Sequence, residues 1–148
     1  LFPYFTSHLI QIADTRKPFL ADETFHFSIS HCGDYAAAIV SRRYRVGIDI
    51  EIPTEKVKRI SQKFVNEGEF RNIKPLSTAD FTQIWSAKEA VFKWYGKGEV
   101  DFKQHILLQF NQFDEPDLHC YFTKTNSRLN IYSRKFAELC LSYVVTAD

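Results

Sequence analysis

Two carboxylates lie two residues apart in the segment 44–51, which reads YRVGIDIE. Its alternation of apolar and polar residues predicts a β-strand, and side chains two residues apart on a strand share a face. Asp49 and Glu51 should therefore project together, with Cα atoms roughly 6–7 Å apart. Two carboxylates this close repel each other unless a cation or a proton lies between them, and oxygen ligands suit Mg²⁺. Gly47, on the same face, leaves room for a bulky group against the strand. The alternative is a solvated edge strand with an acidic outer face.

The segment 78–95 carries a third carboxylate at helical spacing from two other notable side chains. Glu89 follows Trp85 by four residues and precedes Lys93 by four, so the three side chains line one side of a helix. This line runs along the edge of the apolar face, where a carboxylate is partly removed from water and needs a partner. An ordinary surface pair between Glu89 and Lys93, worth about 0.3–0.5 kcal/mol, explains the same spacing.

A histidine ends the next candidate segment, 25–31, which reads FHFSISH. The alternation predicts a strand whose apolar side chains, Phe25, Phe27 and Ile29, share one face. His31 follows the same parity, so a buried histidine in the core is one interpretation. Its place at the end of the strand, beside a glycine turn, instead favours a ligand-facing position.

Helical and strand patterns alternate along the rest of the chain, which predicts an α+β fold with mainly antiparallel sheet packed with a long helix. Apolar residues at helical spacing predict the long helix over 78–95, begun by Ser77 or Thr78 and ended by Gly96. Other expected elements are strands over 35–41 and 44–51, a helical segment around 57–64, and further strands from residue 105 onward.

Composition narrows the class of protein. The 148 residues are 45% hydrophobic and 25% charged, which is typical of a folded domain, and the net charge of +1 argues against nucleic-acid binding. The 3 cysteines have no CxxC spacing, which favours free thiols in a reducing cytoplasm. We find no membrane span and no secretory pattern. The chain starts at Leu1 and contains no Met, so we expect that upstream sequence is missing.

Four segments in order resemble the 4′-phosphopantetheinyl transferase superfamily: RKPF at 16–19, FSISH at 27–31, GIDIE at 47–51 and WSAKEAVFK at 85–93. The last two are the signature of the superfamily. The upstream segments resemble the larger, surfactin-synthetase-activating type, a monomeric pseudo-dimer of two similar halves. On this resemblance, residues 1–34 are the remnant of the N-terminal half and residues 35–148 are the catalytic C-terminal half, with pseudo-twofold halves in the complete fold.

The resemblance implies an activity and its partners. A protein of this kind transfers the 4′-phosphopantetheine group from coenzyme A to a serine of an apo carrier protein, acyl or peptidyl, and releases 3′,5′-ADP with Mg²⁺ as cofactor. It serves fatty-acid, polyketide or nonribosomal-peptide biosynthesis. Two other functions remain open at this point: a metal-dependent phosphodiester hydrolase, and a non-catalytic module that binds coenzyme A.

Roles of single residues also follow from the resemblance alone. Mg²⁺ would be held by the three carboxylates Asp49, Glu51 and Glu89. Coenzyme A would be bound by Lys17, Ser30, His31 and Lys93. The catalytic residues would be Lys93, which helps the leaving group depart, Glu89, and Glu69 as general base for the carrier serine. Glu67, two residues from Glu69, makes that register less certain, and a surface turn explains Lys17 equally well.

The segment 55–75 is locally basic, with six basic residues against three acidic ones. Carrier proteins of this class present an acidic helix, so a basic surface beside the active site would steer them. A solvated helix face explains the same residues. The basic residues are Lys56, Lys58, Arg59, Lys63, Arg71 and Lys74.

Overall fold

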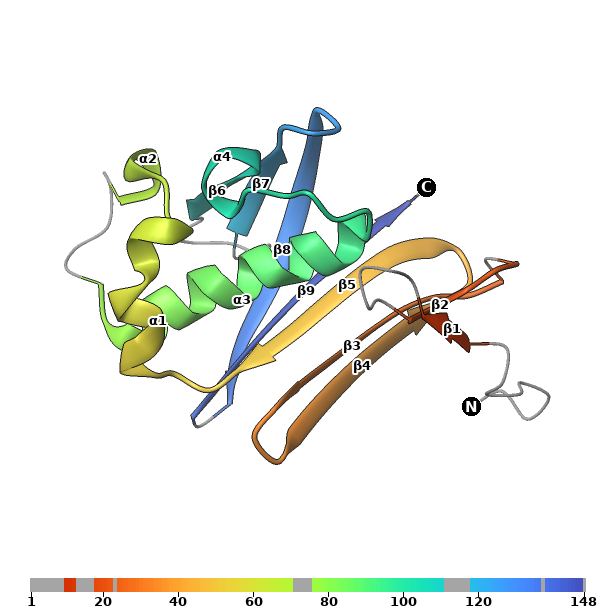
Figure 1. Ribbon diagram of the computed structural model, residues 1–148, viewed down its shortest axis with the longest axis horizontal. Helices are drawn as coiled ribbons and strands as arrows, with labels where there is room; N and C mark the ends of the chain where they lie inside the picture. The colour runs from red at the N-terminus through yellow and green to blue at the C-terminus, as the bar shows by residue number, and fades with distance from the viewer. Residues whose placement is uncertain are drawn as a thin grey trace.

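The structure, a computed structural model, describes residues 10–12, 18–22, 24–70, 76–110, 118–136 and 138–147. Within them the fold is α+β, with a long helix lying across an antiparallel sheet (Figure 1). The predicted fold class is confirmed. None of the helices among these residues has the length and apolar character needed to cross a membrane.

The main sheet has five strands in the order β5-β9-β8-β7-β6, and every neighbouring pair is antiparallel. Its central strand β8 (Ser127–Phe136) pairs on both sides, and β5 lies at one edge. The other strands are β5 (Tyr44–Glu51), β6 (Ile106–Phe110), β7 (Leu118–Phe122) and β9 (Leu139–Ala147).

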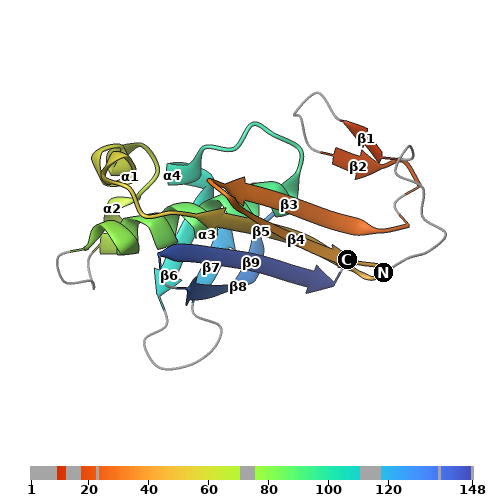
Figure 2. The same ribbon diagram turned by 90° about the horizontal axis from the view of Figure 1, so that it is seen from below.

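Helix α3 (Thr78–Tyr95) covers one face of this sheet, and the core lies between them (Figures 1 and 2). Its bounds match the prediction because both ends are set by local chemistry. The Ser77 side chain accepts a hydrogen bond from the backbone of Asp80, whose carboxylate bonds back to Ser77, and Gly96 ends the helix at φ 70°. These contacts satisfy backbone groups that a helix end leaves unpaired.

Four short helical segments flank α3. The first three follow β5 and lie at the N-terminal end of α3, and the fourth leads into β6 (Figure 1). They are α1 (Glu55–Arg59), η2 (Ser61–Lys63), α2 (Glu67–Phe70) and α4 (Phe102–His105).

A hairpin of β3 (His26–Cys32) and β4 (Tyr35–Ser41) runs alongside β5 (Figure 1). Its turn contains Gly33 at φ 57°, a left-handed conformation that suits glycine. The expected division of the chain between residues 34 and 35 falls inside this turn and stays a prediction. A smaller pair, β1 (Ile10–Ile12) and β2 (Pro18–Leu20), precedes the hairpin.

The alternation predicted for β3 gives it two faces, and the polar face is the more deeply buried one. Ile29 is 51% exposed, whereas Ser28 and Ser30 are 4% and 5% exposed. The reason lies in β5, where the backbone N–H groups of Ile48 and Ile50 donate to the hydroxyls of Ser28 and Ser30 at 3.1 and 3.3 Å. Buried hydroxyls are tolerated when they are hydrogen-bonded in this way.

The bulky group expected against Gly47 is helix α3 itself. A Cβ atom added at Gly47 would lie 2.1 Å from the carbonyl oxygen of Ala90 and 2.6 Å from the backbone nitrogen of Trp94. The missing side chain therefore lets the helix approach β5 closely. That approach sets the distance between the carboxylates on the strand and the residues on the helix.

Candidate active site

Asp49 is the most enclosed carboxylate of the site, at 2% exposure. Its Oδ1 accepts a hydrogen bond from the hydroxyl of Ser30 at 2.9 Å and pairs with Nζ of Lys93 at 2.7 Å. Side chains from β3, β5 and α3 therefore meet at one oxygen atom. Burial raises the pKa of Asp49, while the charge of Lys93 opposes that rise. The solvated-edge interpretation of this strand is wrong, because helix α3 covers the acidic face.

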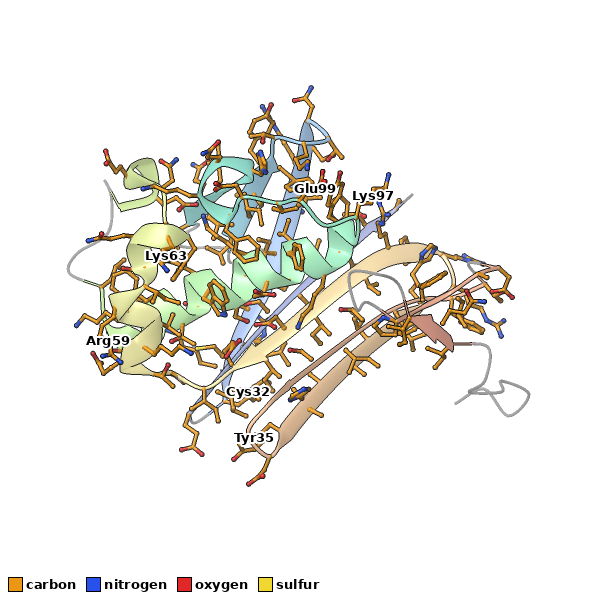
Figure 3. All side chains as sticks on the ribbon, viewed as in Figure 1. Cys32, Tyr35, Arg59, Lys63, Lys97 and Glu99 are labelled. Atoms are coloured by element: carbon orange, nitrogen blue, oxygen red, sulfur yellow. The ribbon has the colours of Figure 1, made fainter. Side chains whose placement is uncertain are left out.

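Glu51 lies two residues further along β5 and is half-buried. Its Oε1 accepts from Nε1 of Trp85 at 3.2 Å, and its Oε2 lies 3.6 Å from Sγ of Cys32, which donates to it. Cys32 lies at the end of β3 beside the end of β5 (Figure 3). The pKa of Glu51 is raised, first by burial and then by the nearby charge of Asp49. The predicted shared face of the two carboxylates is confirmed by their common contacts with α3.

Glu89 and Lys93 lie one turn apart on α3, facing these carboxylates. The pKa of Glu89 is raised to about 7, first by burial and then by the charge of Asp49, while the charge of Lys93 opposes the rise. The ion pair of Lys93 runs to Asp49 on the neighbouring strand, so the interpretation as an isolated helix-surface pair does not describe this lysine. The site therefore brings together three carboxylates and one ammonium group.

These carboxylates suit a hard divalent cation by their chemistry. Asp49 Oδ2 is buried and has no hydrogen-bond partner among the described residues, and the pKa values of Glu51 and Glu89 are both raised by the charge of Asp49. An oxygen-only donor set is what Mg²⁺ prefers. Within the same residues, no three His, Cys, Asp or Glu side chains already surround a single point as a metal site. Binding a cation here would therefore require the carboxylates to come closer together.

The residues predicted to bind coenzyme A fall in three different places. Ser30 lies inside the site with its hydroxyl on Asp49. His31 is exposed and, as the next residue along β3, points to the opposite face of the hairpin. Lys17 lies outside the described residues. The core-histidine interpretation of His31 is therefore wrong, and the proposed contacts of His31 and Lys17 with phosphate stay predictions.

Glu69 is buried at 7% exposure and has a full set of partners. Its carboxylate accepts from the backbone nitrogens of Asn66 and Leu108, each at 2.7 Å, and pairs with Nζ of Lys88 at 2.8 Å. These contacts tie the segment before α3 to β6. The structure thus gives Glu69 a packing role, and its role as general base stays a prediction.

Lys88 was not identified from the sequence as a residue of interest. It is 0% exposed, and besides Glu69 its ammonium donates to the carbonyl oxygens of Phe102 and Ile106 at 2.9 and 2.8 Å. The available signal was its position within the apolar face of the predicted helix, because a lysine there needs a buried partner.

Comparison with known proteins shows which protein family the chain matches. Residues 45–147 match the model of the 4′-phosphopantetheinyl transferase superfamily. The chain is 34% identical over 86 residues to the 4′-phosphopantetheinyl transferase gsp of Aneurinibacillus migulanus, covering 55% of this chain and 35% of that protein. It is 36% identical over 146 residues to a Haemophilus influenzae protein named for the same transferase, covering 88% of this chain and 60% of that protein.

A third relative is enterobactin synthase component D of Salmonella austin, 36% identical over 86 residues that cover 55% of this chain and 36% of that protein. The chain thus spans between about one third and three fifths of the length of these relatives. The family match covers both β5 with its paired carboxylates and α3 with Glu89 and Lys93. This chain belongs to the 4′-phosphopantetheinyl transferase superfamily.

Proposed function

We propose that this chain carries the catalytic residues of an enzyme that transfers 4′-phosphopantetheine from coenzyme A to a serine of a carrier protein. The observation that carries the proposal is the convergence of Asp49, Glu51, Glu89 and Lys93 from one strand and one helix. Three carboxylates with one lysine suit a reaction at a pyrophosphate, where charge must be neutralised and the phosphoryl group positioned. The family membership of the chain supports the same reaction.

The chemistry is a displacement at phosphorus. A bond forms between the serine Oγ of the carrier and the β-phosphorus of coenzyme A, and the bond from that phosphorus to the bridging oxygen breaks. The electron pair leaves with 3′,5′-ADP, and the serine proton passes to a base. Bound Mg²⁺ would supply Lewis-acid stabilisation of the pyrophosphate charge. The residues proposed to hold it are Asp49, Glu51 and Glu89.

Lys93 is proposed to neutralise the pyrophosphate as the bond to 3′,5′-ADP breaks. Its side chain is 25% exposed, so its ammonium can reach a ligand from its present place beside Asp49. A flexible lysine with three donors suits this exchange of partners. Glu69 as the base for the carrier serine would have to give up its contact with Lys88.

The proposed coenzyme A contacts extend beyond the core of the site. Lys17 and His31 would bind phosphate groups from the N-terminal side of the chain. In this proposal residues 1–34 belong to an N-terminal half and residues 35–148 to the catalytic half of a monomeric pseudo-dimer. The free thiols of Cys32, Cys120 and Cys140 are consistent with the reducing, cytoplasmic setting expected of such an enzyme.

A basic surface on α1 and η2 is proposed to receive the acidic carrier protein; we define it as Lys56, Lys58, Arg59 and Lys63, all exposed. The other two basic residues of the segment, Arg71 and Lys74, lie outside the described residues. Figure 3 marks Arg59 and Lys63 near the N-terminal end of α3. Phe64, which follows this surface, packs on Trp85 with ring centroids 5.0 Å apart, and Trp85 bonds to Glu51. Phe64 and Trp85 therefore link this surface to the acidic cluster, by which we mean Asp49, Glu51 and Glu89. Replacing these basic residues by acidic ones should slow association with an acidic partner.

The deciding experiment is intact-mass spectrometry of an apo carrier protein incubated with the full-length natural protein, coenzyme A and Mg²⁺. The proposal expects a mass gain of one phosphopantetheine group, lost when Glu89→Ala is used. Several carriers, fatty-acid and peptide types, should be offered in parallel. No gain on any of them, together with hydrolysis of coenzyme A or of a phosphodiester, would favour a hydrolase instead.

A further inference from the structure

Two buried serines on β3 join the hairpin to β5 in the same way. Each hydroxyl accepts a hydrogen bond from a backbone N–H of β5, Ser28 from Ile48 at 3.1 Å and Ser30 from Ile50 at 3.3 Å. The two serines are two residues apart, share one face of β3, and are almost equally buried at 4% and 5% exposure. As attachments of the hairpin they are equivalent.

Ser30 differs from Ser28 because its hydroxyl also enters the acidic cluster. It donates to Asp49 Oδ1 at 2.9 Å and accepts from Nζ of Lys93 at 2.8 Å. A hydroxyl has one donor and two acceptor positions. With Ile50 as its third partner, the hydroxyl of Ser30 is fully used. No position is left on it for a phosphate oxygen.

These contacts act on one oxygen of Asp49 and leave the other available. Ser30 and Lys93 both engage Oδ1, and Oδ2 is buried with no hydrogen-bond partner in the described part of the chain. The backbone on the other side is held as well, since the hydroxyl of Ser86 on α3 donates to the Asp49 carbonyl at 3.3 Å. The backbone of Asp49 is thus fixed, and its carboxylate could still rotate. The contacts of Ser30 and Lys93 with Oδ1 restrict that rotation.

We propose that Ser30 is a positioning residue: its hydroxyl fixes Oδ1 of Asp49 so that Oδ2 is held ready for a divalent cation, and it does not bind coenzyme A through that hydroxyl. The proposal deepens the function proposed above and rests on it for the identity of the ligand. When Lys93 moves to the pyrophosphate, Ser30 is the neutral donor that keeps the carboxylate in place. A buried carboxylate without that donor would be free to turn away from this orientation.

The first test needs no activity. Unfolding in denaturant is measured for Ser30→Ala, Asp49→Ala and the double variant, and for the matched set with Ser28→Ala. A double-variant cycle isolates the coupling of two side chains. We expect coupling of about fivefold or more in the unfolding equilibrium constant for Ser30 with Asp49, and less than about twofold for Ser28 with Asp49. Equal coupling in both cycles would overturn the proposal.

The second test measures the ligand. Binding of Mn²⁺ is followed by electron paramagnetic resonance in the full-length protein without coenzyme A. We expect the dissociation constant to rise about tenfold in Ser30→Ala, as for loss of a hydrogen bond to a charged group. It should stay unchanged in Ser28→Ala and return toward the natural value in Ser30→Thr, which keeps a hydroxyl.

Steady-state kinetics separate the proposal from direct binding of coenzyme A. Positioning predicts a lower kcat and weaker Mn²⁺ binding in Ser30→Ala, with the KM for coenzyme A little changed. A raised KM for coenzyme A with normal Mn²⁺ binding would mean that Ser30 contacts the substrate, and the proposal would be wrong. Failure of the natural protein to modify any carrier would overturn the proposed function, while the unfolding cycles would still decide the role of Ser30.

Discussion

The ammonium of Lys88 lies in the core of the protein, 2.8 Å from Oε1 of Glu69. Both residues are buried, and burial lowers the pKa of Lys88 while Glu69 opposes that change. The pair joins α3 to the segment before it, and the carbonyl groups of Phe102 and Ile106 complete the shell of the lysine. Removing one partner of a buried pair leaves the other charge without compensation, which costs far more than the pair itself contributes.

Replacing Lys88 by Met should therefore destabilise the protein by about 3–5 kcal/mol in denaturant unfolding, because Glu69 would be left charged in the core. Glu69→Gln should also be destabilising, because the single amide oxygen of Gln can accept from only one of the two backbone N–H groups and Lys88 is left without its charged partner. If Glu69→Gln instead unfolded normally and abolished transfer to the carrier, Glu69 would be the general base and its packing role secondary.

Among the glycines that the structure describes, Gly47 should be the one whose replacement by Ala destabilises the fold most. The added Cβ would meet backbone atoms of α3 at 2.1 and 2.6 Å, which a side-chain rotation cannot relieve. We expect a loss of stability of about 3 kcal/mol or more, at or above the upper end for overpacking, with weaker Mn²⁺ binding as α3 moves away from β5. Thermal unfolding measures it.

Gly68→Ala is the matched control for Gly47. A Cβ there meets only the side chain of Asn66, at an ordinary 3.4 Å, and the residue lies in helix α2. Alanine in that position should be neutral or stabilising by about 0.5–1 kcal/mol. A similar loss for both variants would contradict the close packing of α3 on β5.

The metal-free protein should lose stability as the pH rises from about 4.5 to about 7. Glu89 has a pKa near 7 in the folded protein against 4.5 in the unfolded chain, so the folded state binds the extra proton in this window. Ionising Glu89 beside Asp49 and Glu51, with Lys93 as the opposing charge, should cost on the order of 2–3 kcal/mol. Denaturant unfolding across this range in EDTA measures it.

Glu89→Gln is the control for that titration, because it keeps the shape of the side chain and removes its proton. The slope of stability against pH should become shallower, with a remainder from Asp49 and Glu51, whose pKa values are also raised. An unchanged slope would show that Glu89 titrates normally and that its carboxylate is in contact with water.

Trp85→Phe should weaken Mn²⁺ binding about three- to tenfold, since Phe preserves much of the ring packing but removes the N–H that holds Glu51 Oε1. Trp94→Phe is the matched change on the same helix: it removes an indole N–H bonded to the hydroxyl of Thr146, on β9. Its Mn²⁺ binding should be unchanged. Equal weakening in both variants would point to a general loosening of α3.

Elements set by short-range rules were predictable from the sequence. The strand over 44–51 follows from strict alternation, and the helix over 78–95 from apolar spacing with Ser77 and Gly96 at its ends. The carboxylates of the site lie in these two elements, so their presence could be predicted as well. Their common environment follows once α3 packs on the acidic face of β5.

Features that depend on distant partners were not predictable. The burial of Ser28 and Ser30 in place of Ile29 depends on backbone donors 20 residues away on β5. The pairing of Lys93 with Asp49 crosses 44 residues, and the sequence pattern pointed instead to the neighbour on the same helix. A pattern of alternation identifies two faces of a strand but does not say which of them meets a hydrogen-bonding partner.

The serine attachments of the hairpin also bear on aggregation. β5 is the outermost strand of its sheet, and an uncovered outer strand can recruit a strand from a second molecule. β3 blocks that approach through two hydroxyls instead of a continuous backbone ladder. Heat or mutation that detaches the hairpin while the rest of the fold persists would therefore expose the edge of β5 to pairing with a strand of another molecule. At high protein concentration such pairing would lead to aggregation and make unfolding irreversible.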